Sequence, residues 1–489
     1  MDQAWLEEMR DAQRRWEQQP ISQRLCVVRA LRQAIAADPQ SMAQSIPLRL
    51  SGALHRSEAE SLVAEVMPLL AACRLLEREA EGLLRKHRLG WRGQPLWLAR
   101  VHSTVERVPH GVVFVIAPGN YPLLLAGVQV LQALVAGNAV IWKPAPGTES
   151  VGHTFAEMLA ECGLPPVLLR VVEGDAQVVA QGIRAGVDHI VLTGSAKTGT
   201  AVLHEAAETL TPTTMELSGW DAVFVLPGAD AARAVDAMIF GMCLNGSFTC
   251  MAPRRLFLVG IGDAEAEVIE AELRSRLADL PAVLVSKATR AKFRRIVDDA
   301  RQSGAEIALD GSGREEDAVS ATLIFHANAD MEAMRGEVFA PVLSVMRAAS
   351  VDEAAQAHER SEFRLSAAIF GPEIEARRLA EMLRVGHVVV NDLIAPTADP
   401  RIGFGGAGRS GFGLTRGREG LLAMTRQRVV QVQRSRSRRT YEPVGEAHAG
   451  LFSGMIRGFY AGSLSERFSG LRQMIRSAME LRERENKRR

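Results

Sequence analysis

A repeated order of apolar strand, turn and helix between residues 111 and 226 constrains the fold of this chain more than any other feature. Residues 111–117 are apolar throughout, as expected of a strand buried on both faces. Turn residues break this run, and an apolar helical stretch extends to Ala136. Later strand candidates in the same block are residues 139–143, 168–172 and 189–194. The alternation predicts an α/β fold with a doubly wound parallel sheet, which binds ligands at the carboxyl ends of its strands.

A second alternating block spans roughly residues 230–400. Its strand candidates are residues 256–259, 321–325, 343–346, 367–370 and 388–391. The first hundred residues have helical periodicity, except for extended segments that predict a hairpin at about 90–108. We therefore predict four parts of the chain, namely residues 1–226, 227–410, 411–448 and 449–489.

The last of these parts differs in composition from the rest. Residues 449–489 hold nine Arg and Lys against four Glu, and Phe468, Leu471, Ile475 and Ala478 form a helical stripe. The pattern predicts a basic amphipathic C-terminal extension. Such a helix either lies on an anionic membrane surface or packs against the body of the protein or a partner subunit.

Composition excludes several classes of protein. The chain has 58 basic and 57 acidic side chains, a balance that argues against a nucleic-acid binder. It has no apolar run of the roughly 18 residues that a transmembrane helix needs, and its acidic N-terminus does not resemble a signal peptide. Its five cysteines contain no C-x-x-C pair, which argues against a disulfide scaffold and against a zinc site. We expect a cytoplasmic protein without a metal.

Two glycine-rich segments are candidates for a phosphate-binding loop. Gly403, Gly405 and Gly408 satisfy G-x-G-x-x-G, but a buried strand does not precede them and an apolar helix does not follow. The segment from Gly194 to Gly199 does lie where a strand meets a helix. Its backbone N–H groups would suit a pyrophosphate, although an ordinary helix start capped by Ser195 explains the pattern equally well.

Polar side chains lie at or near the ends of the predicted strands. Asn120 follows the first strand, Lys143 ends the second, and Glu216 lies near the end of residues 213–217. Cys250 follows a helical run over residues 231–248. A thiol, a carboxamide and a carboxylate can serve as nucleophile, oxyanion donor and general base. Spacing alone leaves structural roles open for all three.

The local context of these residues resembles the aldehyde dehydrogenase superfamily, from about residue 5 to 435. The resemblance rests on segments in the family's order, namely residues 116–122, 137–145, 192–199, 215–219, 245–250, 336–341, 389–391 and 404–411. It implies an aldehyde-dehydrogenase-like fold of two doubly wound parallel-sheet domains and a small oligomerisation hairpin. The first part, residues 1–226, would bind the cofactor, and residues 227–410 would carry the nucleophile. Residues 411–448 would return to the cofactor domain.

The family's chemistry carries over to three residues. The resemblance implies that Cys250 attacks an aldehyde, that Asn120 stabilises the oxyanion, and that Glu216 activates the water that hydrolyses the thioester. The cofactor would be NAD or NADP. The residues expected to bind it are Ile116, Ala117, Pro118, Lys143, Gly194, Ser195, Gly199, Leu217, Glu337 and Phe339. The family also implies a homodimer or homotetramer formed through the hairpin and a strand at residues 428–432.

Several residues depart from the family pattern near the site. Gly119 replaces an aromatic residue, Ser247 and Phe248 replace Gly-Gln ahead of the nucleophile, and Pro146 replaces an acidic residue. Pro146 removes a group that would repel a 2′-phosphate, which permits NADP as well as NAD. Two alternative functions remain, an acylating enzyme that uses coenzyme A and a catalytically silent binding homologue. Glu216 argues against the acylating enzyme.

Overall fold

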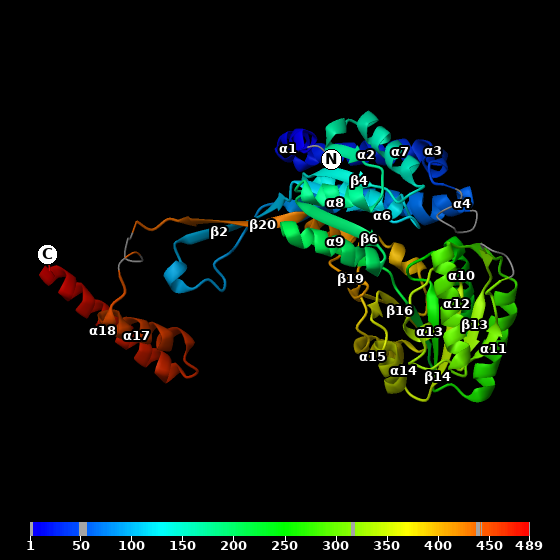
Figure 1. Ribbon diagram of the computed structural model, residues 1–489. Coiled ribbons are helices and arrows are strands. Elements are labelled where there is room, and N and C mark those ends of the chain that lie inside the picture. The colour runs from blue at the N-terminus through cyan, green and yellow to red at the C-terminus, as the bar shows by residue number, and fades with distance from the viewer. Residues whose placement is uncertain (1–2, 48–55, 314–317, 437–440, 442, 489) are drawn as a thin grey trace. The chain divides into compact units, whose positions relative to one another are not determined.

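A six-stranded sheet positions most of the residues predicted to bind the cofactor. The computed structural model describes residues 3–47, 56–313, 318–436, 441 and 443–488. The sheet has the order β19-β7-β6-β3-β4-β5, and only the β19–β7 pair is antiparallel. Its strands are β3 (Val112–Ile116), β4 (Ala139–Lys143), β5 (Leu169–Val171), β6 (His189–Gly194), β7 (Thr213–Leu217) and β19 (Gly411–Phe412). The predicted parallel α/β arrangement is confirmed for this block (Figure 1).

Helices cover this sheet because its central strands are apolar on both faces. Every residue of α6 (Leu124–Ala136) is buried, and the helix contacts α2, α5 and α16. Helical periodicity in the first hundred residues is confirmed as well. The helices of this region are α1 (Gln3–Glu17), α2 (Ile21–Ala37), α3 (Pro39–Gln44), α4 (Glu58–Ser61), α5 (Met67–Leu84), α7 (Glu149–Glu161), α8 (Ala176–Arg184), α9 (Ala196–Thr209) and α16 (Gly417–Ala423).

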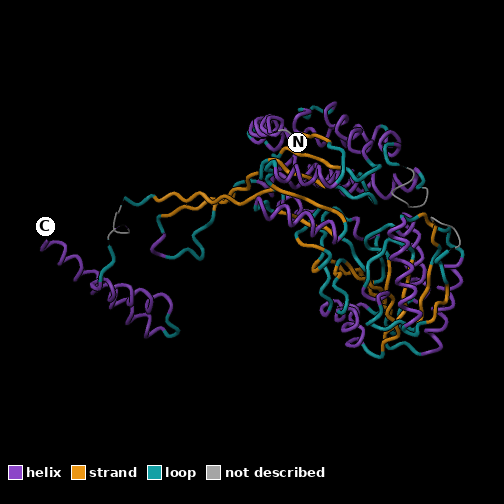
Figure 2. Tube along the Cα trace, in the orientation of Figure 1, coloured by secondary structure: helices purple, strands orange, loops and turns teal. Residues whose placement is uncertain are grey.

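A seven-stranded sheet forms the second α/β layer, with the order β11-β13-β14-β9-β8-β16-β17 and one antiparallel pair, β11–β13. Helices lie on both of its faces (Figure 2). Its strands are β8 (Asp221–Val225), β9 (Pro253–Val259), β11 (Glu306–Leu309), β13 (Thr322–Phe325), β14 (Val342–Ala348), β16 (Ser366–Phe370) and β17 (His387–Val390). Its helices are α10 (Ala231–Cys243), α11 (Asp263–Ala278), α12 (Lys287–Gln302), α13 (Glu332–Arg335), α14 (Val351–Glu359) and α15 (Glu373–Met382).

Alternation of side chains along the central strands gives this sheet two separate cores. Phe224 and Phe257 point to the face covered by α12, α14 and α15, and their rings stack with centroids 4.8 Å apart. Val223 and Leu256, one position earlier on each strand, point to the face covered by α10 and α11. A strand with both faces buried is therefore uniformly apolar in sequence.

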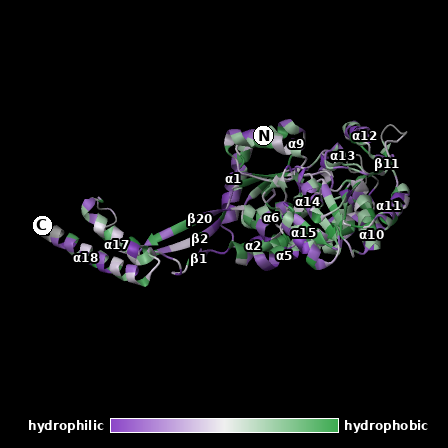
Figure 3. Ribbon diagram, turned by 90° about the horizontal axis from the view of Figure 1, so that it is seen from below, coloured by the Kyte–Doolittle hydropathy of each residue, from purple (hydrophilic) through white to green (hydrophobic). Residues whose placement is uncertain are grey.

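Residues 88–104 and 431–489 form a second compact unit. Within it, α17 (Ala449–Tyr460) and α18 (Leu464–Arg488) pack as a helical hairpin. A Cβ on Gly454 would lie 2.4 Å from the backbone nitrogen of Met474, so glycine permits this close approach. Apolar and charged residues alternate along both helices (Figure 3), and Ile456, Tyr460 and Phe468 are exposed. The predicted helix in the extension is confirmed, but Leu471 of its stripe turns toward α17 and Phe468 does not.

The structure differs from the sequence prediction at three places. Residues 96–98 form a 3₁₀ turn, so the hairpin at 90–108 is not made of two adjacent strands; β2 (Val101–Pro109) pairs instead with β1 (His87–Arg88) and β20 (Thr425–Gln433). The helix that starts at Ala231 ends at Cys243, before the predicted Phe248. The strand at 221–225 belongs to the seven-stranded sheet, although the boundary at residue 226 placed it with the first block.

The remaining short elements are a π-helical turn, several 3₁₀ turns and four two-residue strands. They are η1 (Leu62–Val66), η2 (Leu96–Leu98), η3 (Pro166–Leu168), η4 (Leu244–Ser247), η5 (Ala395–Ala398), η7 (Glu446–His448), β10 (Val283–Leu284), β12 (Ala318–Val319), β15 (Phe363–Arg364) and β18 (Ala407–Gly408). Within the ranges that the structure describes, no helix has both the length and the apolar character needed to span a bilayer.

Candidate active site

A left-handed turn places Cys250 between the two sheets. After α10 ends, Asn245 and Ser247 adopt φ values of 52° and 63°, which are uncommon for residues other than glycine. The buried Arg254 guanidinium donates to the carbonyl and hydroxyl oxygens of Ser247 at 2.6 and 2.7 Å. The turn is thereby fixed just before β9, and Cys250 faces the carboxyl end of β7. Strain of this kind gathers at functional sites.

Two cavities meet at Cys250 and Glu216, because both residues line both of them. The first cavity has a volume of about 270 Å³ and opens along the ends of β3, β6 and β7. Five residues predicted to bind the cofactor line it, namely Pro118, Gly194, Ser195, Leu217 and Phe339. Phe248 lies against Phe339 with ring centroids 5.0 Å apart, at the same cavity.

The second cavity, of about 360 Å³, is apolar. Apart from the two reactive side chains, its charged lining group is Arg416. The apolar or aromatic lining residues are Val63, Ala64, Met67, Pro68, Tyr121, Leu124, Leu125, Phe240, Leu244, Met251, Ile394, Ala395, Ala398 and Phe404. A cavity of this kind binds a ligand mainly by removing its apolar surface from water.

Glu216 is a buried carboxylate on β7, with 2% of its surface exposed. Its Oε2 accepts a hydrogen bond of 2.6 Å from the Thr415 hydroxyl. Burial raises the pKa of Glu216, while the nearby Arg416 charge and the Thr415 hydrogen bond oppose the rise. A carboxyl group with a raised pKa is suited to take up a proton near neutral pH.

Asn120 is held so that its amide nitrogen remains available. Its Oδ1 accepts from the Tyr121 backbone N–H at 3.0 Å, and its backbone carbonyl accepts from Asn245 Nδ2 at 2.9 Å. Among the described residues Asn120 Nδ2 has no acceptor, and the side chain lines the first cavity together with Cys250. The geometry therefore offers a hydrogen-bond donor next to the thiol.

The pKa of the Cys250 thiol lies well above its ordinary value. Burial is the largest cause, and the negative charges of Glu216 and Asp221 add to it, whereas Arg416 opposes the rise. Because the thiolate is the nucleophilic form of cysteine, groups that favour ionisation matter at this position.

The other predicted cofactor residues do not line the first cavity, but several of them contact strands or residues that do. Ser195 and Leu217, which line it, also have structural roles. Ile116 ends β3, and the Ala117 backbone N–H donates to the Lys143 carbonyl at 3.0 Å. A Cβ on Gly199 would lie 2.7 Å from a Leu217 methyl carbon, so glycine lets α9 approach the end of β7. Ser195 caps α9 by accepting from the Thr198 N–H at 3.1 Å, as predicted.

Two of these residues carry unused polar groups that fit a nucleotide cofactor. Lys143 is buried, burial lowers its pKa, and its ammonium group has no hydrogen-bond acceptor among the described residues. Glu337 lies 3.5 Å from Lys292 through Oε2, while its Oε1 is buried without a partner. Hydroxyl groups of a ribose would satisfy such atoms. Across the described residues, His, Cys, Asp and Glu form no cluster that could hold a metal ion.

Sequence reasoning missed two residues that contact the reactive groups. Thr415 and Arg416 lie about two hundred positions after Glu216 in the chain, and the β19–β7 pairing brings them to it. The sequence signal that could have indicated them is their position directly after the glycine-rich segment 403–413, because the end of that segment pairs with β7 at Glu216.

The chain is similar to known proteins over most of its length. The model of the aldehyde dehydrogenase family matches residues 2–430. The chain is 33% identical over 417 residues to the 4,4'-diapolycopene aldehyde oxidase of a Methylomonas species, which covers 83% of this chain and 77% of that relative. It is similar to the NADP-bound crystal structure of a glyceraldehyde-3-phosphate dehydrogenase from Bacillus halodurans, with 26% identity, TM-score 0.77, and coverage of 88% and 90%. Betaine aldehyde dehydrogenase from Staphylococcus aureus shares the fold, with 24% identity, TM-score 0.78, and coverage of 90% and 88%.

Proposed function

The chain belongs to the aldehyde dehydrogenase family, and on this premise we propose that Cys250, Glu216 and Asn120 oxidise an aldehyde to a carboxylate. The enzyme is an NAD(P)-dependent aldehyde dehydrogenase. One observation supports the assignment of residues most directly. Cys250 and Glu216 line two cavities at once. One cavity is also lined by the residues predicted to bind the cofactor, and the other is apolar.

In the first step the Cys250 thiolate adds to the aldehyde carbonyl carbon, and a C–S bond forms. The carbonyl oxygen becomes an oxyanion, to which Asn120 Nδ2 donates a hydrogen bond. One such donor contributes about 3–4 kcal/mol to the stability of the transition state. A nicotinamide cofactor held at the first cavity would supply the acceptor for the hydride that leaves this carbon, so that the carbon bonded to Cys250 would be oxidised by two electrons to a thioester.

In the second step Glu216 removes a proton from a water molecule that attacks the thioester. The C–S bond breaks, the Cys250 thiolate is regenerated, and the acyl group leaves as a carboxylic acid that loses its proton to solvent and becomes a carboxylate. The raised pKa of Glu216 allows it to hold the proton that it takes from water. This base supports hydrolysis over transfer of the acyl group to coenzyme A.

We further infer that the preferred aldehyde is apolar, because the second cavity has a long apolar lining that ends at the thiol. Aldehydes with an alkyl chain or aromatic ring would bury that surface, whereas short hydrophilic aldehydes would gain little.

Production of the reduced nicotinamide, followed by its absorbance, tests the function. Full-length enzyme with NAD or NADP is expected to oxidise medium-chain and aromatic aldehydes, and Cys250→Ala is expected to abolish the reaction. Cys243→Ala is a matched control, because this cysteine is exposed and lies outside both cavities. Activity that persists in Cys250→Ala would contradict the assignment. Cofactor binding without activity in any combination would support a silent homologue.

We also infer a homodimer or homotetramer, in the cytoplasm. The second unit exposes large apolar side chains, namely Trp91, Trp97, Ile456, Tyr460, Phe468, Ile475 and Met479. Exposed apolar area on this scale is typical of an interface. Light scattering after size exclusion is expected to give a multiple of the 53.1 kDa chain mass. Sedimentation with anionic vesicles, with and without residues 449–489, distinguishes a subunit interface from a membrane contact.

A further inference from the structure

Arg416 is a half-buried cation, and among the described residues it has no carboxylate partner. Of the described carboxylates, not one lies within ion-pair distance of its guanidinium. Nη1 donates to the Thr397 carbonyl at 3.2 Å, the group lies over the Phe404 ring at 4.4 Å, and Nε is buried without an acceptor. Burying a charge that is not paired is costly, so the protein must gain something from its position.

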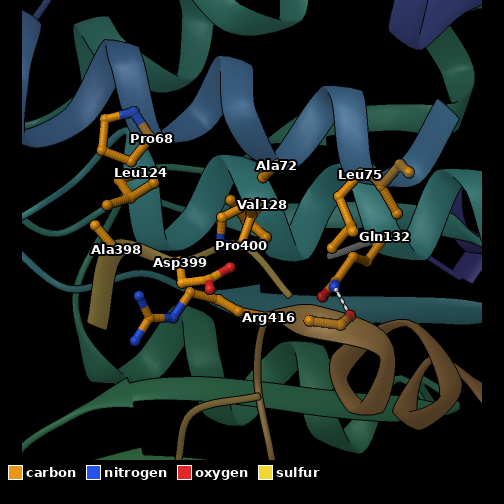
Figure 4. A pocket seen from close by; sticks show the side chains of 12 residues that line it. Pro68, Ala72, Leu75, Leu124, Val128, Gln132, Ala398, Asp399, Pro400 and Arg416 are labelled. Carbon is orange, nitrogen blue, oxygen red and sulfur yellow. Dashed lines mark hydrogen bonds between the residues drawn. The ribbon is translucent and has the colours of Figure 1, made fainter. Parts of the chain in front are cut away.

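The backbone at Arg416 is strained as well. Its φ of 60° and ψ of 179° lie in a region that glycine occupies almost exclusively. The residue begins α16, and its neighbour Gln132 donates to the Gly417 carbonyl at 2.9 Å. Figure 4 shows the side chain extending from the start of α16 beside Asp399 and Ala398. Arg416 lines both the small cavity drawn there and the apolar cavity that ends at Cys250.

The charged and titratable groups around this position can be named. Glu216, Asp221 and Tyr121 face Cys250 together with Arg416. Asp221 already has Arg254 and Arg255 close to it, whereas Arg416 is the cation that acts on both Cys250 and Glu216. The pKa of His387 on β17 is lowered, first by burial and then by the charge of Arg416.

We propose that Arg416 is a positioning residue whose positive charge favours the ionised forms of Cys250 and Glu216, with which it lines the apolar cavity. The inference rests on the proposed function for its catalytic meaning. Removal of water from this cavity favours the neutral thiol and the neutral carboxyl group, and a nearby guanidinium opposes both preferences. The strained backbone and the unpaired Nε of Arg416 both lower the stability of the fold, and they accompany the placement of its charge at the cavity where the substrate is proposed to bind.

Alkylation of Cys250 tests the proposal without cofactor or aldehyde. The full-length enzyme is treated with iodoacetamide over a range of pH, and modification of Cys250 is followed by peptide mass spectrometry. In Arg416→Gln, which keeps a hydrogen-bond donor for Thr397 but loses the charge, the alkylation profile is expected to move to higher pH. A shift of one unit lowers the rate about tenfold at a fixed pH below the pKa. Arg416→Lys keeps the charge and is expected to stay within about threefold of the wild type.

Arg418→Gln is the matched control. Arg418 is two positions away, exposed, and paired with Glu79, so its loss should leave the profile of Cys250 unchanged. The exposed Cys26 serves as an internal standard for reagent and folding in every variant. Identical Cys250 profiles in the wild type and Arg416→Gln would overturn the proposal. Equal shifts in the Gln and Lys variants would also overturn it, because they would indicate a packing role. Loss of aldehyde oxidation in the wild type would refute the proposed function but would leave this measurement intact.

Discussion

The Thr415 hydroxyl lies 2.6 Å from Oε2 of Glu216, although the two residues come from distant segments of the chain. The pairing of Gly411 with Glu216 between β19 and β7 creates this proximity. The general base is therefore positioned by the glycine-rich segment that returns to the first sheet.

Thr415→Val should impair hydrolysis of the thioester. Without the hydroxyl, the Glu216 carboxylate loses a donor that lowers its pKa, so its pKa should rise further. The base form is then lost at higher pH on acidification, so the acidic limb of the kcat profile should move to higher pH. Loss of one hydrogen bond to a charged group corresponds to about 1.5–3 kcal/mol, or roughly tenfold to a hundredfold in rate. Thr415→Ser should restore the profile, and a profile unchanged in the Val variant would contradict this role.

Asn120→Ala should remove the oxyanion donor while leaving the fold intact, because the Asn245 contact uses the Asn120 backbone carbonyl. We expect kcat to fall by about 10²–10³, with a much smaller change in KM. Steady-state kinetics measures both quantities. Asn328→Ala, a substitution at an exposed loop position, is the control. A loss confined to KM would show that Asn120 only binds substrate.

Met67→Asp should change substrate preference, since Met67 lines the apolar cavity and is 60% exposed. A carboxylate there should raise KM for long-chain aldehydes by about tenfold, within the range for altered apolar contacts. The KM for acetaldehyde should hardly change. Met382→Asp carries the same substitution at another exposed methionine. Equal effects on short and long aldehydes would place the substrate chain elsewhere.

Glu65→Gln should destabilise the fold. The buried carboxylate of Glu65 pairs with Arg56 and accepts hydrogen bonds from the backbone N–H groups of Leu123 and Leu124, just before and at the start of α6. Breaking a buried ion pair costs about 3–5 kcal/mol, which urea unfolding would report as a lower midpoint. Glu373→Gln removes an exposed pair with Arg377 and should cost less than about 0.5 kcal/mol. Similar midpoints for both variants would contradict a structural role for Glu65.

The local chemistry of the sequence predicted many elements of the fold. The strands at 139–143 and 189–194 and the Ser195 cap agree with the structure because each depends on neighbouring residues. The sequence did not predict which sheet contains the strand at 221–225, because an apolar run carries no information about the strands that flank it.

The candidate site was only partly predictable for the same reason. Asn120, Glu216 and Cys250 were found from strand ends and local motifs, and the structure places them around the same cavity. Arg416 and Thr415 escaped notice because long-range pairing brings them there. The end of α10 at Cys243 was missed because left-handed residues other than glycine follow it, and propensity does not predict them.

In the proposed reaction, Cys250 forms a thioester that Glu216 helps water to hydrolyse. Stopped-flow absorbance of the reduced nicotinamide, with Glu216→Gln and a medium-chain aldehyde, tests this step directly. We expect a burst equal to the enzyme concentration followed by slow turnover, with intact-mass spectrometry showing one acyl group on Cys250. Turnover at the wild-type rate without a trapped acyl group, or a burst that persists in Cys250→Ala, would contradict it.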